Sequence, residues 1–105
     1  MGGHALAPLL APKAIAILGA SQRPGSPGNE AVREALRGRF PGKIFPVNPR
    51  YTAIEGLACH PALKDLPERP DVVMLLVSND KLEIALDEAI AVGAKGAVIL
   101  DSCYL

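Results

Sequence analysis

The strongest constraint on the fold is a set of four short apolar runs that are rich in β-branched side chains. Their length and composition favour strands over helices. Three of the runs are continuously apolar and lack the alternation of a strand with one wet face, which indicates a sheet covered by helices on both sides. The predicted strands are residues 14–18, 43–47, 71–77 and 96–100.

A first amphipathic helix is predicted between the first two strands. Apolar residues between positions 31 and 36 lie on one side of it, and charged residues lie on the other. Ser26 is a good N-cap, Pro27 suits the first helical position, and Gly38 is placed to end the helix.

A second helix is predicted between the last two strands. Apolar residues recur at helical spacing from position 82 to position 90, and Gly93 marks the end. Residues 78–80 mark its start, and Asp80 and Glu83 have the spacing of a capping box.

The segment 48–70 is irregular and holds four prolines. A short strand is expected to begin at Gly56, and residues 62–66 predict one helical turn. Strands separated by helices imply right-handed crossovers. The expected fold class is therefore α/β and Rossmann-like, with a mostly parallel sheet of about five strands and helices on both faces. The length of 105 residues predicts one domain, residues 1–105.

Composition disfavours several classes of function. The formal net charge is zero and aromatic residues make up 4% of the chain, so a nucleic-acid surface is not expected. No apolar run approaches the roughly 20 residues needed to cross a membrane, and no signal-peptide pattern is present. A cytoplasmic location is therefore predicted, without membrane association. Cys59 and Cys103 lack metal-ligand spacing, so two reduced thiols and no metal site are expected.

A glycine-rich loop follows the first predicted strand. Residues 17–32 read "ILGASQRPGSPGNEAV", with Gly19, Gly25 and Gly28 between the strand and the first helix. In a parallel sheet, ligands bind beyond the carboxyl ends of the strands, and the amides of such a loop form an anion site. The loop is interpreted as a phosphate cradle, with a simple tight turn as the alternative. Its spacing departs from the G-x-G-x-x-G dinucleotide fingerprint.

The end of the second strand distinguishes between nucleotide ligands. An NAD site requires an acidic residue there, whereas this chain has Asn48, Pro49 and Arg50, and the next carboxylate is Glu55. An arginine suits a phosphorylated ribose, as in NADP or coenzyme A. The alternative is a solvated arginine in a loop. The first 50 residues also carry seven basic and two acidic side chains, which suits an anionic ligand.

Several stretches together resemble a known family. They are "PKAIAILGASQRPGSPGNEAVREAL", "GKIFPVNPRY", "GLACHPALKDLPERPDVVMLLV" and "AIAVGAKGAVIL". Their order and spacing resemble the N-terminal coenzyme A-binding domain of NDP-forming acyl-CoA synthetases, a group related to the alpha subunit of succinyl-CoA synthetase. The resemblance covers the chain from about residue 6 to residue 100 and implies a Rossmann-like fold.

The resemblance also implies a ligand site in three parts. Asn48, Pro49 and Arg50 would lie near the adenosine and its 3′-phosphate, with Lys43 adding general attraction. The family usually has Val-Pro-Ala after the third long strand, where this chain has Val77, Ser78 and Asn79, which would line the adenine and pantetheine side. The residues expected to face the diphosphate are Gly19, Ala20, Ser21, Gly25, Ser26 and Gly28.

Family enzymes make the acid, free coenzyme A and a nucleoside triphosphate from an acyl-CoA, a nucleoside diphosphate and phosphate. The phosphoryl group passes through a histidine in a later subdomain, and a separate ATP-grasp domain binds the nucleotide. His60 does not match that histidine. The chain is therefore expected to be an excised or truncated domain that binds coenzyme A or acyl-CoA without catalytic residues. Its expected partners are the ligase and ATP-grasp domains of a synthetase.

Three alternatives remain open from the sequence. The same type of domain occurs in synthetase-like protein lysine acetyltransferases, where its role is regulatory. An NADP-binding module of an oxidoreductase is a second alternative, and a ligand-free scaffold is a third.

Overall fold

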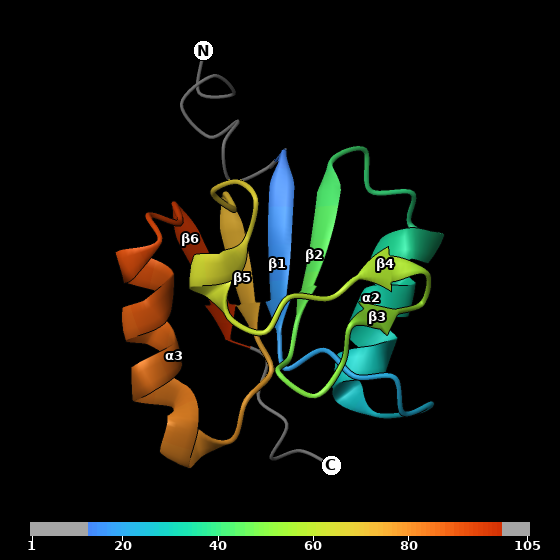
Figure 1. The fold of residues 1–105 in the computed structure, drawn as a ribbon, viewed down its shortest axis with the longest axis horizontal. Helices are drawn as coiled ribbons and strands as arrows, with labels where there is room; N and C mark the ends of the chain where they lie inside the picture. Colours follow the sequence, from blue (N-terminus) through green and yellow to red (C-terminus); the bar gives the residue numbers. More distant parts are fainter. Residues whose placement is uncertain (1–12, 100–105) are drawn as a thin grey trace.

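The computed structural model describes residues 13–99, which form a four-stranded parallel sheet between two helices (Figure 1). The sheet order is β2-β1-β5-β6, so the chain crosses from one side of β1 to the other after β2. The elements in chain order are β1 (Ala14–Leu18), α2 (Pro27–Arg37), β2 (Lys43–Val47), β3 (Ala53–Ile54), β4 (Leu57–Ala58), the 3₁₀ turn η1 (Leu63–Asp65), β5 (Val72–Leu75), α3 (Asn79–Ala91) and β6 (Gly96–Ile99).

The predicted fold class is confirmed, and most predicted strand bounds agree with the structure. β1 and β2 have the predicted bounds, whereas β5 is shorter at both ends than the predicted segment 71–77. The last position predicted for the fourth strand, residue 100, lies outside the described residues. All three strand pairs of this sheet are parallel, as the strand–helix alternation requires.

Side chains of the central strands alternate between two apolar cores, one under each helix. Ala16 of β1 and Leu75 of β5 pack with Ala85 and Ala89 of α3 and with Leu63 of η1. On the opposite face, the core beneath α2 contains Ile17, Ala20, Val32, Ile54 and Cys59. Because both faces of β1 are covered, its run is continuously apolar and Ala16 and Ile17 are fully buried.

The short strand expected at Gly56 is β4, which pairs antiparallel with β3 in a separate two-residue ladder. Beyond it, His60 forms a single parallel bridge with Val47 of β2, so the segment touches the edge of the main sheet without forming a fifth strand of it. Glu55 and Gly56 between β3 and β4 both have positive φ, 51° and 82°, which is the backbone of a tight hairpin turn. Because this turn reverses the chain, the described part of the main sheet has four strands instead of about five.

The predicted helix ends are confirmed for α2; for α3 the predicted end is confirmed, because Gly93 follows the C-cap with φ of 80°, and the start is revised. The Asn29 N–H donates to the Ser26 hydroxyl oxygen at 3.2 Å, so Ser26 is the N-cap of α2 and Pro27 follows it. Gly38 is the C-cap. In α3 the N-cap is Ser78, so Asp80 lies within the first turn and the predicted capping box does not form. No helix among residues 13–99 has the length and apolar character to cross a membrane.

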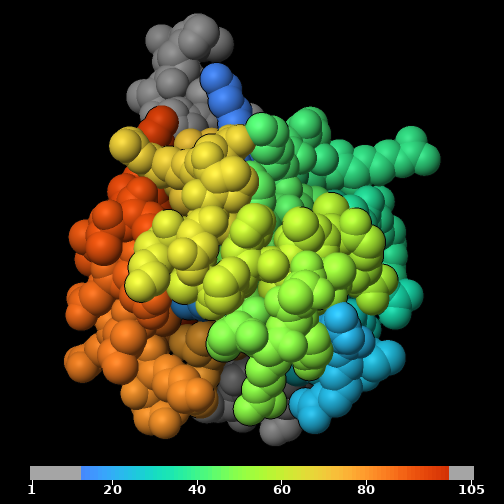
Figure 2. Space-filling view, in the orientation of Figure 1, coloured from blue at the N-terminus to red at the C-terminus, as the bar shows by residue number. Residues whose placement is uncertain are grey.

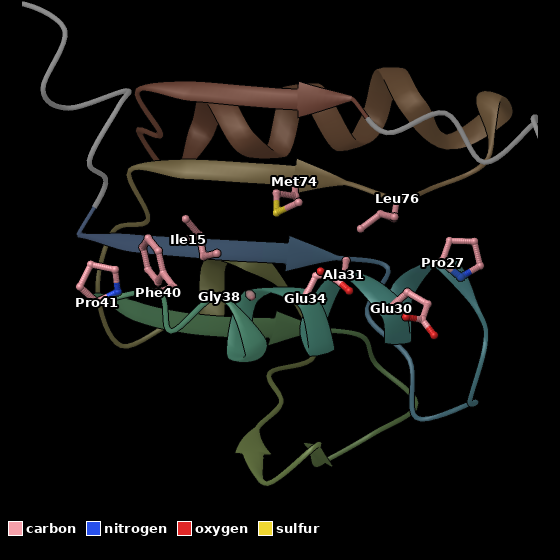
Figure 3. A pocket seen from close by; sticks show the side chains of 11 residues that line it. Ile15, Pro27, Glu30, Ala31, Glu34, Gly38, Phe40, Pro41, Met74 and Leu76 are labelled. Carbon is pink, nitrogen blue, oxygen red and sulfur yellow. The ribbon is translucent and has the colours of Figure 1, made fainter.

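An apolar groove of about 630 Å³ runs beside α2 on its face of the sheet. Figure 3 shows Ile15, Met74 and Leu76 pointing into it from β1 and from the segment that contains β5, with Phe40 at one end. Val98 pairs with Met74 in the sheet register and is 45% exposed. Within the described residues, this half of the α2 face is therefore covered less completely than the α3 face.

Candidate functional site

A cleft of about 700 Å³ opens at the carboxyl ends of β1, β2 and β5, beside the start of α3. Figure 2 shows the surface hollowed between α3, in orange, and the green segment that follows β2. Of the twelve predicted site residues, seven line this cleft: Gly19, Ser21, Asn48, Pro49, Arg50, Val77 and Ser78. The other five do not line it: Ala20, Gly25 and Ser26 lie in the loop, Gly28 in the first turn of α2, and Asn79 at the first position of α3.

Two of the loop glycines are required by close backbone approach. Gly19 has φ of 95°, and a Cβ atom there would lie 2.1 Å from the carbonyl oxygen of Leu76, just after β5. A Cβ atom on Gly28 would lie 2.1 Å from the carbonyl oxygen of Gly19. The glycines therefore allow the loop, the segment after β5 and the first turn of α2 to pack directly against one another.

The loop leaves several of its amides without partners. Within the described residues, the N–H groups of Ala20, Ser21, Gln22 and Gly25 have no hydrogen-bond acceptor. The Asn48 amide donates to the carbonyl oxygen of Ala20 at 2.8 Å. Because every described peptide is trans, the Ser21 N–H of that peptide points the opposite way. Unpaired amides next to the N-terminus of a helix form an anion-binding arrangement.

The Ser26 hydroxyl is engaged within the loop. It donates to the carbonyl oxygen of Arg23 at 2.7 Å and accepts the Asn29 N–H, and the Ser26 N–H also donates to Arg23. Ser26 is only 8% exposed. These contacts indicate that Ser26 holds the loop together, and they argue against a direct contact between Ser26 and a ligand.

Three cations line the cleft. Arg50 follows β2, Arg23 belongs to the glycine loop and Lys81 belongs to the first turn of α3, and all three are exposed. None of them forms an ion pair within the part of the chain that the structure describes. One carboxylate, that of Glu88, shares the cleft. The cleft therefore presents an excess of unpaired positive charge, which attracts anions.

Lys43 does not belong to this site. It is the first residue of β2, at the amino end of the strand, and its ammonium group pairs with Glu68 at 2.5 Å. The cleft is at the other end of the same strand, so the attraction expected from Lys43 is not supported by its position.

The sequence prediction missed several lining residues, among them Arg23, Tyr51, Lys81, Ile84 and Glu88. Arg23 stood inside the predicted loop, and Tyr51 followed the predicted Arg50. The last three share one side of α3 at i, i+3 and i+7. This spacing is visible in the sequence, but the sequence does not indicate what that side of the helix faces. The Tyr51 hydroxyl lies 3.4 Å from the Ser21 hydroxyl, which also accepts the Arg23 N–H at 3.0 Å.

At the α3 end of the cleft, Ser78 was expected to contact the adenine and pantetheine side of the ligand, but its hydroxyl bonds within the chain. The Ser78 hydroxyl donates to the Asp80 carboxylate at 2.5 Å, and this bond lowers the pKa of Asp80. The hydroxyl is therefore already engaged, although Ser78 lines the cleft. The cleft as a whole combines free amides, cations and apolar side chains, which suits a ligand with phosphate groups and a less polar part.

Comparison with known proteins agrees with this geometry. The family model described as CoA binding domain matches residues 13–104. An ADP-forming acetate–CoA ligase of Archaeoglobus fulgidus is 37% identical over 96 residues, which is 91% of this chain and 14% of the relative. A second such ligase, from Methanocaldococcus jannaschii, is 38% identical over 93 residues, 89% of this chain and 13% of the relative.

A solved structure supports the same conclusion. The dinucleotide forming acetyl-coenzyme A synthetase 1 of Candidatus Korarchaeum cryptofilum, in complex with phosphate and ADP, matches with a TM-score of 0.84 and 37% identity. The match covers 88% of this chain and 20% of that one. This chain thus spans a small part of the length of these two ligases and of this synthetase. With the family model matched along most of its length, the chain belongs to the CoA binding domain family.

Proposed function

We propose that the cleft binds coenzyme A. The proposal rests on one observation: the glycine loop after β1 and Arg50 after β2 line the same cleft. The loop offers unpaired amides to a diphosphate, and Arg50 offers charge-assisted hydrogen bonds to the 3′-phosphate of the ribose. Membership of the CoA binding domain family supports this assignment over a bare tight turn.

In this proposal Arg23 and Lys81 add charge attraction from the loop and from α3. Coenzyme A carries its phosphates close together, and unpaired cations at the rim attract such a ligand at long range. Tyr51 and Ile84 offer less polar surface to the adenine or the pantetheine. The contacts predicted for Val77, Ser78 and Asn79 stay predictions within this proposal.

We also propose that the chain is the coenzyme A-recognition domain of an ADP-forming acyl-CoA synthetase. The relatives reported above are ligases of this kind, and the chain spans 13–14% of their length. By this proposal the domain binds coenzyme A or acyl-CoA, and other domains of the synthetase supply the phosphoryl transfer. The regulatory domain of an acetyltransferase has no supporting observation among these relatives.

Titration calorimetry with coenzyme A, dephospho-coenzyme A, NADP and NAD tests the proposal. A charge-assisted hydrogen bond is worth about 1.5–3 kcal/mol, so loss of the 3′-phosphate should weaken binding by roughly ten- to a hundredfold. Arg50→Ala should remove most of this difference between the two ligands. Arg33→Ala is the matched control, because Arg33 is an exposed arginine of α2 that does not line the cleft.

Two results contradict separate parts of the proposal. Absence of coenzyme A binding by the wild-type chain contradicts the function itself. Equal affinities of the wild-type chain for coenzyme A and dephospho-coenzyme A contradict the role of Arg50 alone. Tighter binding of NADP than of coenzyme A would favour the dinucleotide alternative.

A further inference from the structure

Asn29 is a buried polar side chain whose hydrogen bonds all serve other segments. It is 1% exposed, although it belongs to the first turn of α2. Its amide nitrogen donates to the carbonyl oxygen of Ser21 at 3.0 Å and to the Glu55 carboxylate at 3.0 Å. Its own carbonyl oxygen, Oδ1, is buried and has no partner among the described residues.

The unpaired oxygen of Asn29 argues against a purely stabilising role. A buried acceptor without a donor costs free energy, and nearly all buried polar groups in native proteins avoid this cost. An apolar side chain at this position would carry no such cost. The side chain is thus explained by what its two N–H groups hold in place, namely the glycine loop and the β3–β4 turn.

The bond to Ser21 fixes the direction of a peptide in the glycine loop. Because that peptide is trans, holding the Ser21 carbonyl toward Asn29 turns the Gln22 N–H away from Asn29 and the core. The Gln22 N–H is one of the loop amides without an acceptor in the described chain. Gln22 lies between Ser21 and Arg23, which both line the cleft, so Asn29 sets the orientation of a free donor at the border of the proposed diphosphate site.

The bond to Glu55 ties the same asparagine to the β3–β4 hairpin. Glu55 occupies the first position of the turn with φ of 51°, a conformation that side chains other than Gly, Asn and Asp rarely adopt. A second tie joins the same two segments, because the Gln22 side-chain amide donates to the carbonyl oxygen of Ala53 at 2.6 Å. The hairpin thus braces the glycine loop although it lies outside the parallel sheet.

We infer that Asn29, held by Glu55, is a positioning residue that presets the diphosphate-binding loop for coenzyme A. This inference rests on the proposed function and deepens it. The hairpin, through Glu55, restricts the rotation of the Asn29 side chain, and Asn29 restricts the Ser21–Gln22 peptide. Ligand binding then costs less conformational entropy, because the free amide is already in place.

Glu55→Asn and Glu55→Gln form a matched pair of tests. E55N suits the turn, because Asn before Gly is the preferred sequence for a hairpin with two positive φ angles, but the shorter side chain does not reach Asn29. E55Q keeps an acceptor oxygen at the same reach. We expect E55N to fold with unchanged or raised thermal stability and to bind coenzyme A about three- to tenfold more weakly. E55Q should bind like the wild type.

A second readout needs no ligand. Nuclear magnetic resonance order parameters for the Ser21 and Gln22 amides should fall from the rigid range, about 0.85, toward about 0.6 in E55N and stay high in E55Q. Unchanged order parameters or unchanged coenzyme A affinity in E55N would overturn the positioning role, as would equal losses in both variants. If the wild-type chain fails to bind coenzyme A, the proposed function fails, and the order parameters still decide whether Glu55 and Asn29 brace the loop.

Discussion

Gly19→Ala should destabilise the fold by more than a glycine-to-alanine change at another positive-φ position. Gly19 has φ of 95°, and its missing Cβ would lie 2.1 Å from the Leu76 carbonyl oxygen and 2.9 Å from its carbon. Both atoms are backbone, so no side-chain rotation relieves the contact. The loop and the segment after β5 must therefore separate by about 1 Å. The hydrogen bond from the Leu76 N–H to the Leu18 carbonyl oxygen, 2.9 Å long, lies at the same place.

The magnitude follows from two separate costs. An alanine at positive φ costs about 1–2 kcal/mol, and overpacking of a close contact typically adds about 1–3 kcal/mol. Gly25 is the matched control, because it has φ of 82° but nothing within 4 Å of its missing Cβ. Gly25→Ala should therefore show the backbone cost alone, and Gly19→Ala should show both costs.

Urea unfolding followed by circular dichroism measures both variants against the wild type. We expect the unfolding free energy to fall by about 2–5 kcal/mol in Gly19→Ala and by about 1–2 kcal/mol in Gly25→Ala, with similar m-values. The difference corresponds to a melting temperature lower by at least about 4 °C in Gly19→Ala. Equal destabilisation by the two substitutions would refute the argument that Gly19 is required by close approach to Leu76.

Two further predictions concern the cores on the two faces of the sheet. Leu75→Ala should lower the unfolding free energy by about 2–5 kcal/mol, and Met74→Ala by clearly less, because Leu75 is fully buried and Met74 faces the open groove; equal losses in urea unfolding would contradict this difference. Burial raises the pKa of the Cys59 thiol above its ordinary value of 9.0. As the pH rises, the thiol of the unfolded state therefore ionises before that of the folded state. The stability that the neutral buried thiol contributes is present below about pH 9 and is lost at higher pH. Unfolding measured between about pH 8 and about pH 10 should show a smaller alkaline loss in Cys59→Ala than in the wild type.

The type of each main element and its place along the chain were predictable because local patterns record burial and backbone conformation. β1 is continuously apolar since both of its faces are covered, and Ser26 followed by Pro27 is a favourable local start for a helix. The hairpin was only partly predictable. Its short strand was expected near Gly56, but the turn at Glu55 requires a positive φ that glutamate does not signal.

The candidate site was predicted where the sequence carries a local signal and missed where it does not. The glycine loop and Arg50 can be recognised in the sequence because their residue types follow the end of a predicted strand, and both border the cleft. Lys81 looks like any exposed lysine at the start of a helix, and only the position of α3 beside β5 brings it there. That Arg50 and Gly19 contact a ligand stays a prediction, and calorimetry tests it.

The sequence by itself determined a two-sided parallel sheet with a glycine-rich loop after its first strand, because apolar periodicity and glycine spacing act over a few residues at a time. Only the tertiary structure decided that Asn48 holds the carbonyl of Ala20 and that Glu55 holds the Asn29 side chain. Each of these contacts joins segments more than 25 residues apart in the chain. The Asn48 contact exists because the strand order places β2 beside β1, and no local pattern encodes that order.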